Sequence, residues 1–99
     1  MRVKSVEFHE EADAEYERAF DWYFARSEPA AFDFVREVDR AIEAIVQAPG
    51  RWPSDANGIR KFLLRRFPFA LIYRELTSKI EILAVAHGHR RPGYWRDRF

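Results

Sequence analysis

The sequence has 99 residues, of which 47% are hydrophobic, 16% aromatic and 33% charged. This composition predicts one soluble globular domain over residues 1–99. No apolar run approaches the roughly 18 residues of a membrane-spanning helix, so we expect no membrane contact, no secretory leader and a cytoplasmic location. The chain contains no cysteine, which excludes disulfides, thiolate nucleophiles and cysteine-ligated zinc within it.

The formal net charge of +1 conceals an asymmetry between the two halves of the chain. Residues 1–50 contain 12 acidic and 6 basic residues, whereas residues 51–99 contain 4 acidic and 11 basic ones. The second half therefore predicts a basic surface that suits nucleic acid or an acidic protein segment. The alternative is a dipolar protein whose two halves neutralise each other.

The first half predicts one strand and two helices. Residues 2–8 alternate apolar and polar side chains, the pattern of a half-buried strand. From about Glu10, apolar residues recur every three or four positions and predict an amphipathic helix that ends near Ser27. Pro29 is compatible with the first turn of a second helix, and "APGRWP" ends that helix. Two helices joined by so short a connection predict an antiparallel hairpin. The first helix has a run of acidic residues that we interpret as its solvated face: Glu10, Glu11, Asp13, Glu15 and Glu17.

The second half predicts three strands, over residues 59–67, 69–76 and 79–87, because these segments are short, rich in Ile, Leu, Phe and Tyr, and separated by turn residues. Tight turns between them indicate an antiparallel meander. We therefore predict an α+β fold of order β-α-α-β-β-β, in which the helical hairpin packs on one face of a small twisted antiparallel sheet. The other face would be available to a partner.

The residues after the last strand carry most of the chemistry that the sequence offers. His87 and His89 could share one face, but no third ligand lies nearby, so we expect no metal site. His87 could act as a general base or could simply bond to backbone at a strand end. Arg90 could clamp phosphate, while Tyr94 could stack on a base or pack back on the sheet. No Gly-rich phosphate loop, Ser-His-Asp arrangement or facing carboxylate pair is recognisable, and we expect no cofactor.

The order of these features resembles the RelE/ParE superfamily of toxins from bacterial type II toxin–antitoxin systems, which includes plasmid stabilisation proteins. The resemblance covers essentially the whole chain. It rests on Arg60 with Leu64, on the "RFPFALIYR" strand of residues 66–74, and on a His-x-x-Arg-x-Pro-x-x-Trp pattern formed by His87, Arg90, Pro92 and Trp95. It implies a growth-arresting toxin that a cognate antitoxin neutralises in a hetero-oligomeric complex.

Two target classes occur among such toxins, and the resemblance implies different residues for each. RelE-like members cleave mRNA on the ribosome without a metal, whereas ParE-like members inhibit DNA gyrase. The nuclease members have two lysines two residues apart, of which Lys61 matches one and Leu63 replaces the other, and Ala70 stands where they have an arginine. Losing two cations would weaken electrostatic stabilisation of the transition state. We therefore favour a ParE-like toxin that is not an enzyme.

The alternative is a metal-independent endoribonuclease in which His87, Arg90 and Tyr94 are the catalytic residues. A third hypothesis is a chain that has lost toxicity and only binds its antitoxin. For the target we predict a basic binding surface made of Lys61, Arg65, Arg66, Arg74, Arg90 and Arg91. For the antitoxin we predict a contact with exposed apolar residues, namely Phe24, Phe32 and Phe62.

Overall fold

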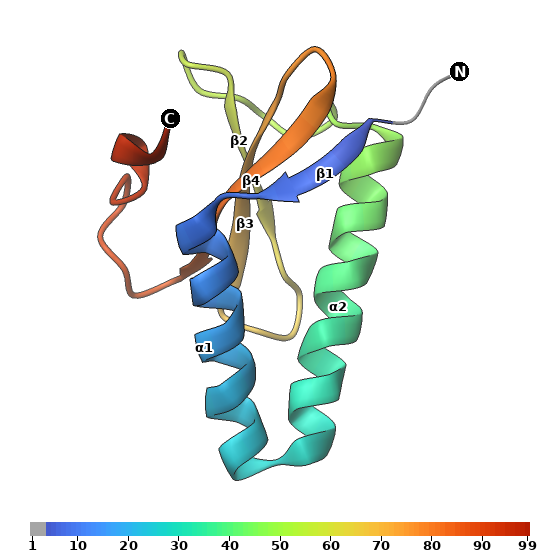
Figure 1. The fold of residues 1–99 in the computed structure, drawn as a ribbon, viewed down its shortest axis with the longest axis vertical. Helices are drawn as coiled ribbons and strands as arrows, with labels where there is room; N and C mark the ends of the chain where they lie inside the picture. Colours follow the sequence, from blue (N-terminus) through green and yellow to red (C-terminus); the bar gives the residue numbers. More distant parts are fainter. Residues whose placement is uncertain (1–3) are drawn as a thin grey trace.

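A computed structural model of the chain describes residues 4–99 (Figure 1). Its elements follow in the order β1 (Ser5–Phe8), α1 (Glu10–Arg26), α2 (Glu28–Gln47), β2 (Ile59–Leu63), β3 (Phe69–Glu75) and β4 (Lys79–His87). A short 3-10 helix, η1 (Arg96–Arg98), lies near the C-terminus. The predicted α+β order is confirmed. Residues 2 and 3 of the predicted first strand lie outside the described residues.

The helical hairpin is formed around a single junction residue. Ser27 ends α1 through a hydrogen bond from its backbone N–H to the carbonyl of Tyr23, at 2.7 Å, and begins α2 by accepting the N–H of Ala30 at its Oγ, at 3.3 Å. Pro29 occupies the first turn of α2, where its missing N–H costs no helical hydrogen bond. The chain therefore reverses within one residue and the helices run antiparallel, as the sequence predicts.

The sheet has the strand order β1-β4-β3-β2. Strands β2, β3 and β4 form the predicted antiparallel meander, but β1 pairs with β4 in parallel. The sheet is therefore mixed and not wholly antiparallel. Tight turns dictate the direction of each meander strand, whereas no turn connects β1 to β4, and their relative direction follows from how the helices pack.

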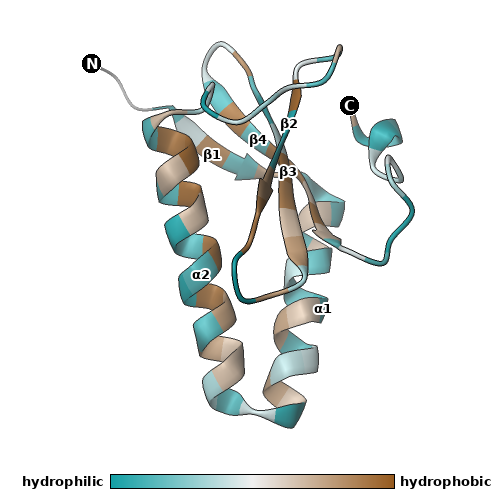
Figure 2. Cartoon of the chain, turned by 180° about the vertical axis from the view of Figure 1, so that it is seen from behind, coloured by the Kyte–Doolittle hydropathy of each residue, from teal (hydrophilic) through white to brown (hydrophobic). Residues whose placement is uncertain are grey.

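One face of the sheet carries the main core. Both helices cover it, and its fully buried side chains include Phe34, Val38, Tyr73, Ile80 and Ile82. Viewed from behind, the sheet exposes its second face, with apolar residues in brown along the strands (Figure 2).

The second face of the sheet is not wholly free for a partner, contrary to our expectation. We call residues 88–99 the C-terminal segment. Its Trp95 is buried in a second cluster against this face, with Ile59, Ala70, Ile72, Leu83 and Ala84. A register shift opposite Ile72 and Tyr73 leaves one extra residue in β4, which places Leu83 and Ala84 together in this cluster. Trp95 therefore anchors the chain end to the sheet, and its neighbour Tyr94, for which packing on the sheet was one of two roles considered, packs against the same cluster.

Candidate functional site

A groove between the sheet and the C-terminal segment brings together residues that lie far apart in the sequence. It has a volume of about 410 Å³. Lys61 comes from β2 and His87 from the end of β4, while Arg90, Arg91 and Tyr94 come from the C-terminal segment. The groove therefore unites the three candidate catalytic residues with two further cations of the predicted target surface.

The other three cations of that predicted surface lie elsewhere. Arg65 and Arg66 line a neighbouring groove against α2, which shares Leu63 with the first one. Arg74 lies on β3, where its Nε donates to Oε1 of Glu81 at 2.8 Å and its guanidinium lies 5.5 Å from the ring centre of Phe99. Arg74 is therefore engaged by these neighbours, and it does not line the groove.

Glu37 of α2 explains the position of the loop that carries Arg65 and Arg66. Its side chain is 11% exposed and accepts the backbone N–H groups of both arginines, the one from Arg66 at 3.1 Å, together with Nε of Arg66 at 3.3 Å. A carboxylate that receives backbone N–H groups in this way satisfies donors that the turn would otherwise leave unpaired. The helix thus holds a basic loop in place.

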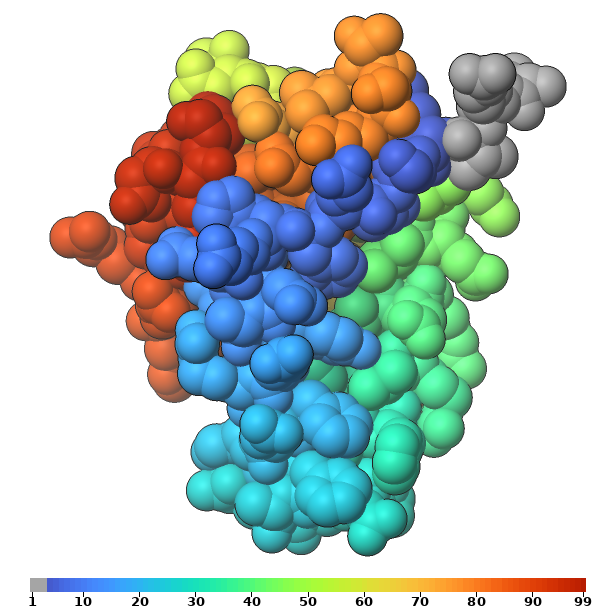
Figure 3. Space-filling view, viewed as in Figure 1, coloured from blue at the N-terminus to red at the C-terminus, as the bar shows by residue number. Residues whose placement is uncertain are grey.

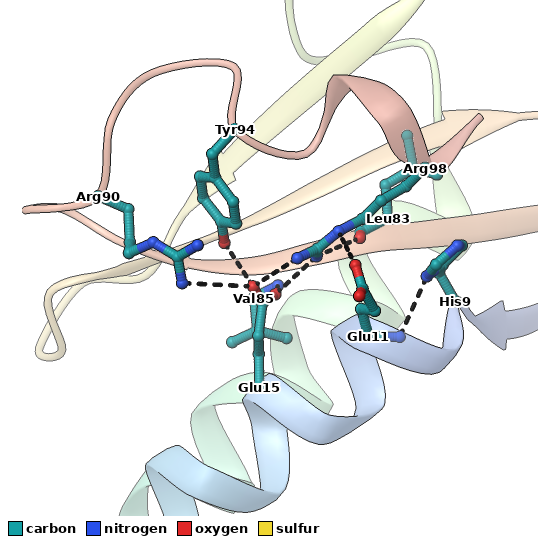
Figure 4. Close-up of polar contacts among 8 residues, drawn as sticks. All are labelled: His9, Glu11, Glu15, Leu83, Val85, Arg90, Tyr94 and Arg98. Atoms are coloured by element: carbon teal, nitrogen blue, oxygen red, sulfur yellow. Dashed lines mark hydrogen bonds and ion pairs between the residues drawn. The ribbon is translucent and has the colours of Figure 1, made fainter.

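Glu15 of α1 plays the same part for the C-terminal segment, and sequence analysis misplaced it on the solvated face of the helix. The residue is only 6% exposed. Its Oε1 accepts the N–H of Val85 at 2.9 Å and Nη1 of Arg98 at 3.0 Å, while its Oε2 accepts the hydroxyl of Tyr94 at 2.8 Å and Nη2 of Arg98 at 3.0 Å (Figure 4). The helical period could have indicated this burial, because Glu15 is three residues after Ala12 and four before Ala19, both of which are buried.

Arg98 completes this network from the C-terminal side. Its side chain is 7% exposed, its Nη1 also donates to the carbonyl of Leu83 at 3.0 Å, and its Nε lies 3.0 Å from Oε2 of Glu11. The two hydrogen bonds from Arg98 Nη1 and Nη2 to the two carboxylate oxygens of Glu15 make a two-pronged pair, which is both strong and geometrically specific. It joins the last residues of the chain to the second turn of α1.

These contacts change the pKa values of both partners of the Tyr94–Glu15 hydrogen bond. Burial alone would raise the pKa of Glu15, but hydrogen bonds from Arg98, Tyr94 and the Val85 amide outweigh it, and the pKa is lowered from its usual 4.5. Burial and the hydrogen bond to Glu15 both raise the pKa of Tyr94 well above its usual value. The Tyr94 phenol therefore stays protonated and serves as a hydrogen-bond donor.

Arg90 is divided between this network and the solvent. Its guanidinium stacks over the ring of Tyr94 at 3.8 Å from the centroid, and its Nη1 lies 3.8 Å from Oε2 of Glu15. Its side chain is nevertheless 51% exposed. About half of the Arg90 side chain can therefore contact a partner while its guanidinium stays stacked on Tyr94.

His87 has the surroundings of a histidine at a strand end. Its Nδ1 accepts the backbone N–H of His89 at 3.0 Å. Its ring meets those of Phe69 and His89 edge to face, each at 5.0 Å between centroids. This bond to backbone agrees with the plainer of the two roles considered for His87. It requires an unprotonated Nδ1, so only Nε2 carries the proton in this arrangement.

The three phenylalanines of the predicted antitoxin contact differ in exposure. Phe24 and Phe32 are 44% and 45% exposed at the tip of the helical hairpin, where both pack against Phe20. Phe62 is half-buried and packs against Trp52 at 4.7 Å between ring centroids. The structure brings the first two together and places the third on the edge strand β2, away from that tip.

Neither a metal cluster nor a membrane span appears in the described part of the chain. No group of three or more His, Cys, Asp or Glu residues within residues 4–99 is arranged to hold a metal ion. No helix there is long and apolar enough to cross a membrane.

Comparison with known proteins agrees with this arrangement. The family model described as the ParE toxin of the type II toxin–antitoxin system parDE matches residues 6–92. A solved structure described as the chromosomal ParDE toxin–antitoxin system from P. aeruginosa superposes with a TM-score of 0.73 at 24% sequence identity, covering 86% of this chain and 96% of that chain. No curated protein sequence matches significantly.

The fold and the groove together define a small α+β protein with a helical hairpin on one face of its sheet and a basic C-terminal segment on the other. The match over residues 6–92 assigns the chain to a family. It belongs to the ParE toxin family of type II toxin–antitoxin systems.

Proposed function

We propose that this toxin arrests growth by binding an essential protein, DNA gyrase, through the groove beside its C-terminal segment, and that a cognate antitoxin neutralises it. The observation that carries this choice of target is the hydrogen bond from the Tyr94 hydroxyl to the buried carboxylate of Glu15. A ribonuclease would need reactive groups in the groove that can exchange protons with RNA. Tyr94 directs its hydroxyl proton to an internal acceptor, Glu15, and its raised pKa disfavours the phenolate that could act as a general base.

The remaining side chains of the groove support binding over cleavage. Lys61 and Arg91 are exposed, and no ion pair of either is found among residues 4–99. Leu63, where the nuclease members have a lysine, is 67% exposed beside them. Ala70, where they have an arginine, is buried beneath Trp95. A surface of two free cations around exposed apolar atoms suits a protein partner with an acidic patch.

The antitoxin contact that we propose uses the exposed aromatic tip of the hairpin, with Phe24 and Phe32. Aromatic side chains supply much of the binding energy in protein interfaces because they bury a large area with little loss of entropy. The tip is the end of the helical hairpin that lies away from the C-terminal segment (Figure 1). The antitoxin would therefore have to cover the target-binding groove with a further part of its chain, or block access to it sterically.

The proposal is tested by adding the purified toxin to a gyrase supercoiling assay and, in parallel, mapping 5′ ends of cellular transcripts shortly after induction. We expect inhibition of supercoiling with intact transcripts. Lys61→Ala and Arg91→Ala should each weaken inhibition by roughly tenfold, as losing a charged interface contact does. Lys79→Ala is the matched control. Lys79 of β4 pairs with Glu7 of β1, the edge strand at the opposite side of the sheet from β2, which carries Lys61.

Discrete in-frame cuts within translated regions, lost in Arg90→Ala, together with unaffected gyrase would establish the ribonuclease alternative. Growth without arrest, unaffected gyrase and intact transcripts would instead indicate a chain that has lost its toxicity.

A further inference from the structure

The buried carboxylate of Glu15 does not itself line the groove, yet it contacts three residues of the segment that forms one wall of it. It accepts two hydrogen bonds from Arg98 and one from Tyr94, and Nη1 of Arg90 lies 3.8 Å away. Its fourth hydrogen bond, from the Val85 N–H, ties the same carboxylate to β4. Glu15 on α1 is thus a common acceptor for donors from β4 and from the C-terminal segment.

We propose that Glu15 is a positioning residue for the C-terminal segment, and that its ion pair with Arg98 works as a latch holding Arg91 and the Arg90–Tyr94 stack beside the groove. The inference rests on the proposed function in one respect: it takes Arg90 and Arg91 to contact the target. The latch itself can be tested without any target.

The backbone of the C-terminal segment gives it little attachment of its own. The amide of Gly88 donates to the carbonyl of Pro68 at 2.8 Å, but the later backbone bonds of the segment are local turns three residues long, such as Tyr94 N–H to Arg91 carbonyl at 3.2 Å and Arg98 N–H to Trp95 carbonyl at 3.0 Å. A segment held by local turns alone would exchange among many conformations. Side chains must therefore fix its place.

Several side-chain attachments do so, and three of them show how unequal they are. Trp95 packs in the second cluster, which fixes the middle of the segment without specifying its rotation. Arg96 pairs with Asp55 at 3.5 Å, but both side chains are substantially exposed, at 56% and 34%, so this pair is weak. The Glu15–Arg98 pair is 5% and 7% exposed, and removing either partner would leave the other charge buried.

The latch fixes the far end of the stretch that contains Arg90, Arg91 and Tyr94, whose near end is fixed by β4. Residue 87 ends β4, and Arg98 is fixed to α1, so residues 88–97 form a loop closed at both ends. Tyr94 is fixed inside that loop by the same carboxylate. The direction in which Arg90 and Arg91 project is consequently set by Glu15, a residue more than 70 positions earlier.

Glu15→Gln tests the latch, because it keeps the size of the side chain and removes its charge. Glu7→Gln is the matched control, since Glu7 also accepts from a basic side chain of another element, Lys79, but is 59% exposed. We expect the amides of Tyr94, Arg96 and Arg98 in folded Glu15→Gln to exchange hydrogen at least about tenfold faster, with α2 and β3 amides unchanged. Glu7→Gln should match the wild type.

Arg98→Lys provides an independent variant if Glu15→Gln folds poorly. It retains the charge but removes the second prong of the pair, so exchange should again accelerate in the C-terminal segment alone. Unchanged exchange in that segment would overturn the latch. Equal acceleration in α2 and β3 would also overturn it, because Glu15 would then support the whole fold.

A double-mutant cycle tests whether the latch acts through the arginines. If Glu15 positions Arg91, then Arg91→Ala should weaken gyrase inhibition much less in the Glu15→Gln background than in the wild type. Additive effects, or full potency of Glu15→Gln, would overturn the positioning role even if the exchange result holds. Wild-type toxin that leaves gyrase untouched would contradict the proposed function, while the exchange experiment would still decide the latch.

Discussion

At the scale of single residues, the two buried carboxylates organise the basic half of the chain. Glu15 and Glu37 come from different helices, and each accepts hydrogen bonds from a segment rich in arginine. Burying a carboxylate is costly unless its oxygens are fully paired. In each case the paired donors include backbone N–H groups as well as guanidinium groups, which is why these two carboxylates are tolerated inside.

The pH dependence of stability should reveal the contribution of Glu15. Because its pKa in the folded protein lies below the usual 4.5, the ionised carboxylate stabilises the fold above that pH, and its contribution disappears as the pH falls through the folded value. Urea unfolding at pH 7 should give a free energy of unfolding about 3 kcal/mol lower for Glu15→Gln than for the wild type. The gap should narrow below pH 4.5. A gap that stays constant down to pH 3 would contradict this account.

At the scale of elements, the helical hairpin depends on one residue in an unusual way. Ser27 is extended, with φ −163° and ψ 108°, and it ends one helix and begins the next. Its backbone N–H satisfies a carbonyl of α1 and its hydroxyl satisfies an amide of α2, so both helix ends are capped without any intervening loop. The short junction forces the helices to pack side by side.

Ser27→Ala should remove the cap of α2 while leaving that of α1, whose donor is a backbone group. We expect a loss of about 1 kcal/mol in the free energy of unfolding, the usual cost of deleting a serine N-cap. Thermal or urea unfolding measures it. Ser78→Ala is the control, because Ser78 is exposed in the turn between β3 and β4 and should change stability negligibly. Equal losses in the two variants would argue against the cap.

At the scale of the whole molecule, acidic and basic residues segregate with the architecture. The acidic first half supplies β1 and both helices, and the basic second half supplies the meander and the C-terminal segment. The space-filling view shows the tip of the hairpin projecting beyond the body, with no other segment over it in that view (Figure 3). An aromatic cluster at such a projecting tip is a surface that favours association.

The isolated toxin should therefore self-associate through the aromatic tip when no antitoxin covers it. Replacing Phe24 and Phe32 together by serine should shift the protein towards monomer in sedimentation velocity experiments over a range of concentrations. Leu63→Ser is the control, since Leu63 is more exposed, at 67%, but lies beside the groove. Association that persists in the double variant and vanishes in Leu63→Ser would place the contact at the groove instead.

Several features were determined by the sequence alone. Periodicity located both helices, the junction at Ser27 and the three strands of the meander to within a few residues, because local patterns and turn residues dictate them. The motif around His87, Arg90, Pro92 and Trp95 indicated the toxin family that the family model confirms. These inferences depend on interactions between residues close in the sequence, or on a pattern preserved in order.

The tertiary structure alone decided the direction of β1, the cover over the second face of the sheet and the burial of Glu15. No turn connects β1 to β4, so only packing of the hairpin sets their parallel pairing. Whether a glutamate on a helix is solvated or buried depends on donors that arrive from elsewhere, and here they come from Tyr94 and Arg98 at the far end of the chain. Only folding brings such distant partners within hydrogen-bonding distance.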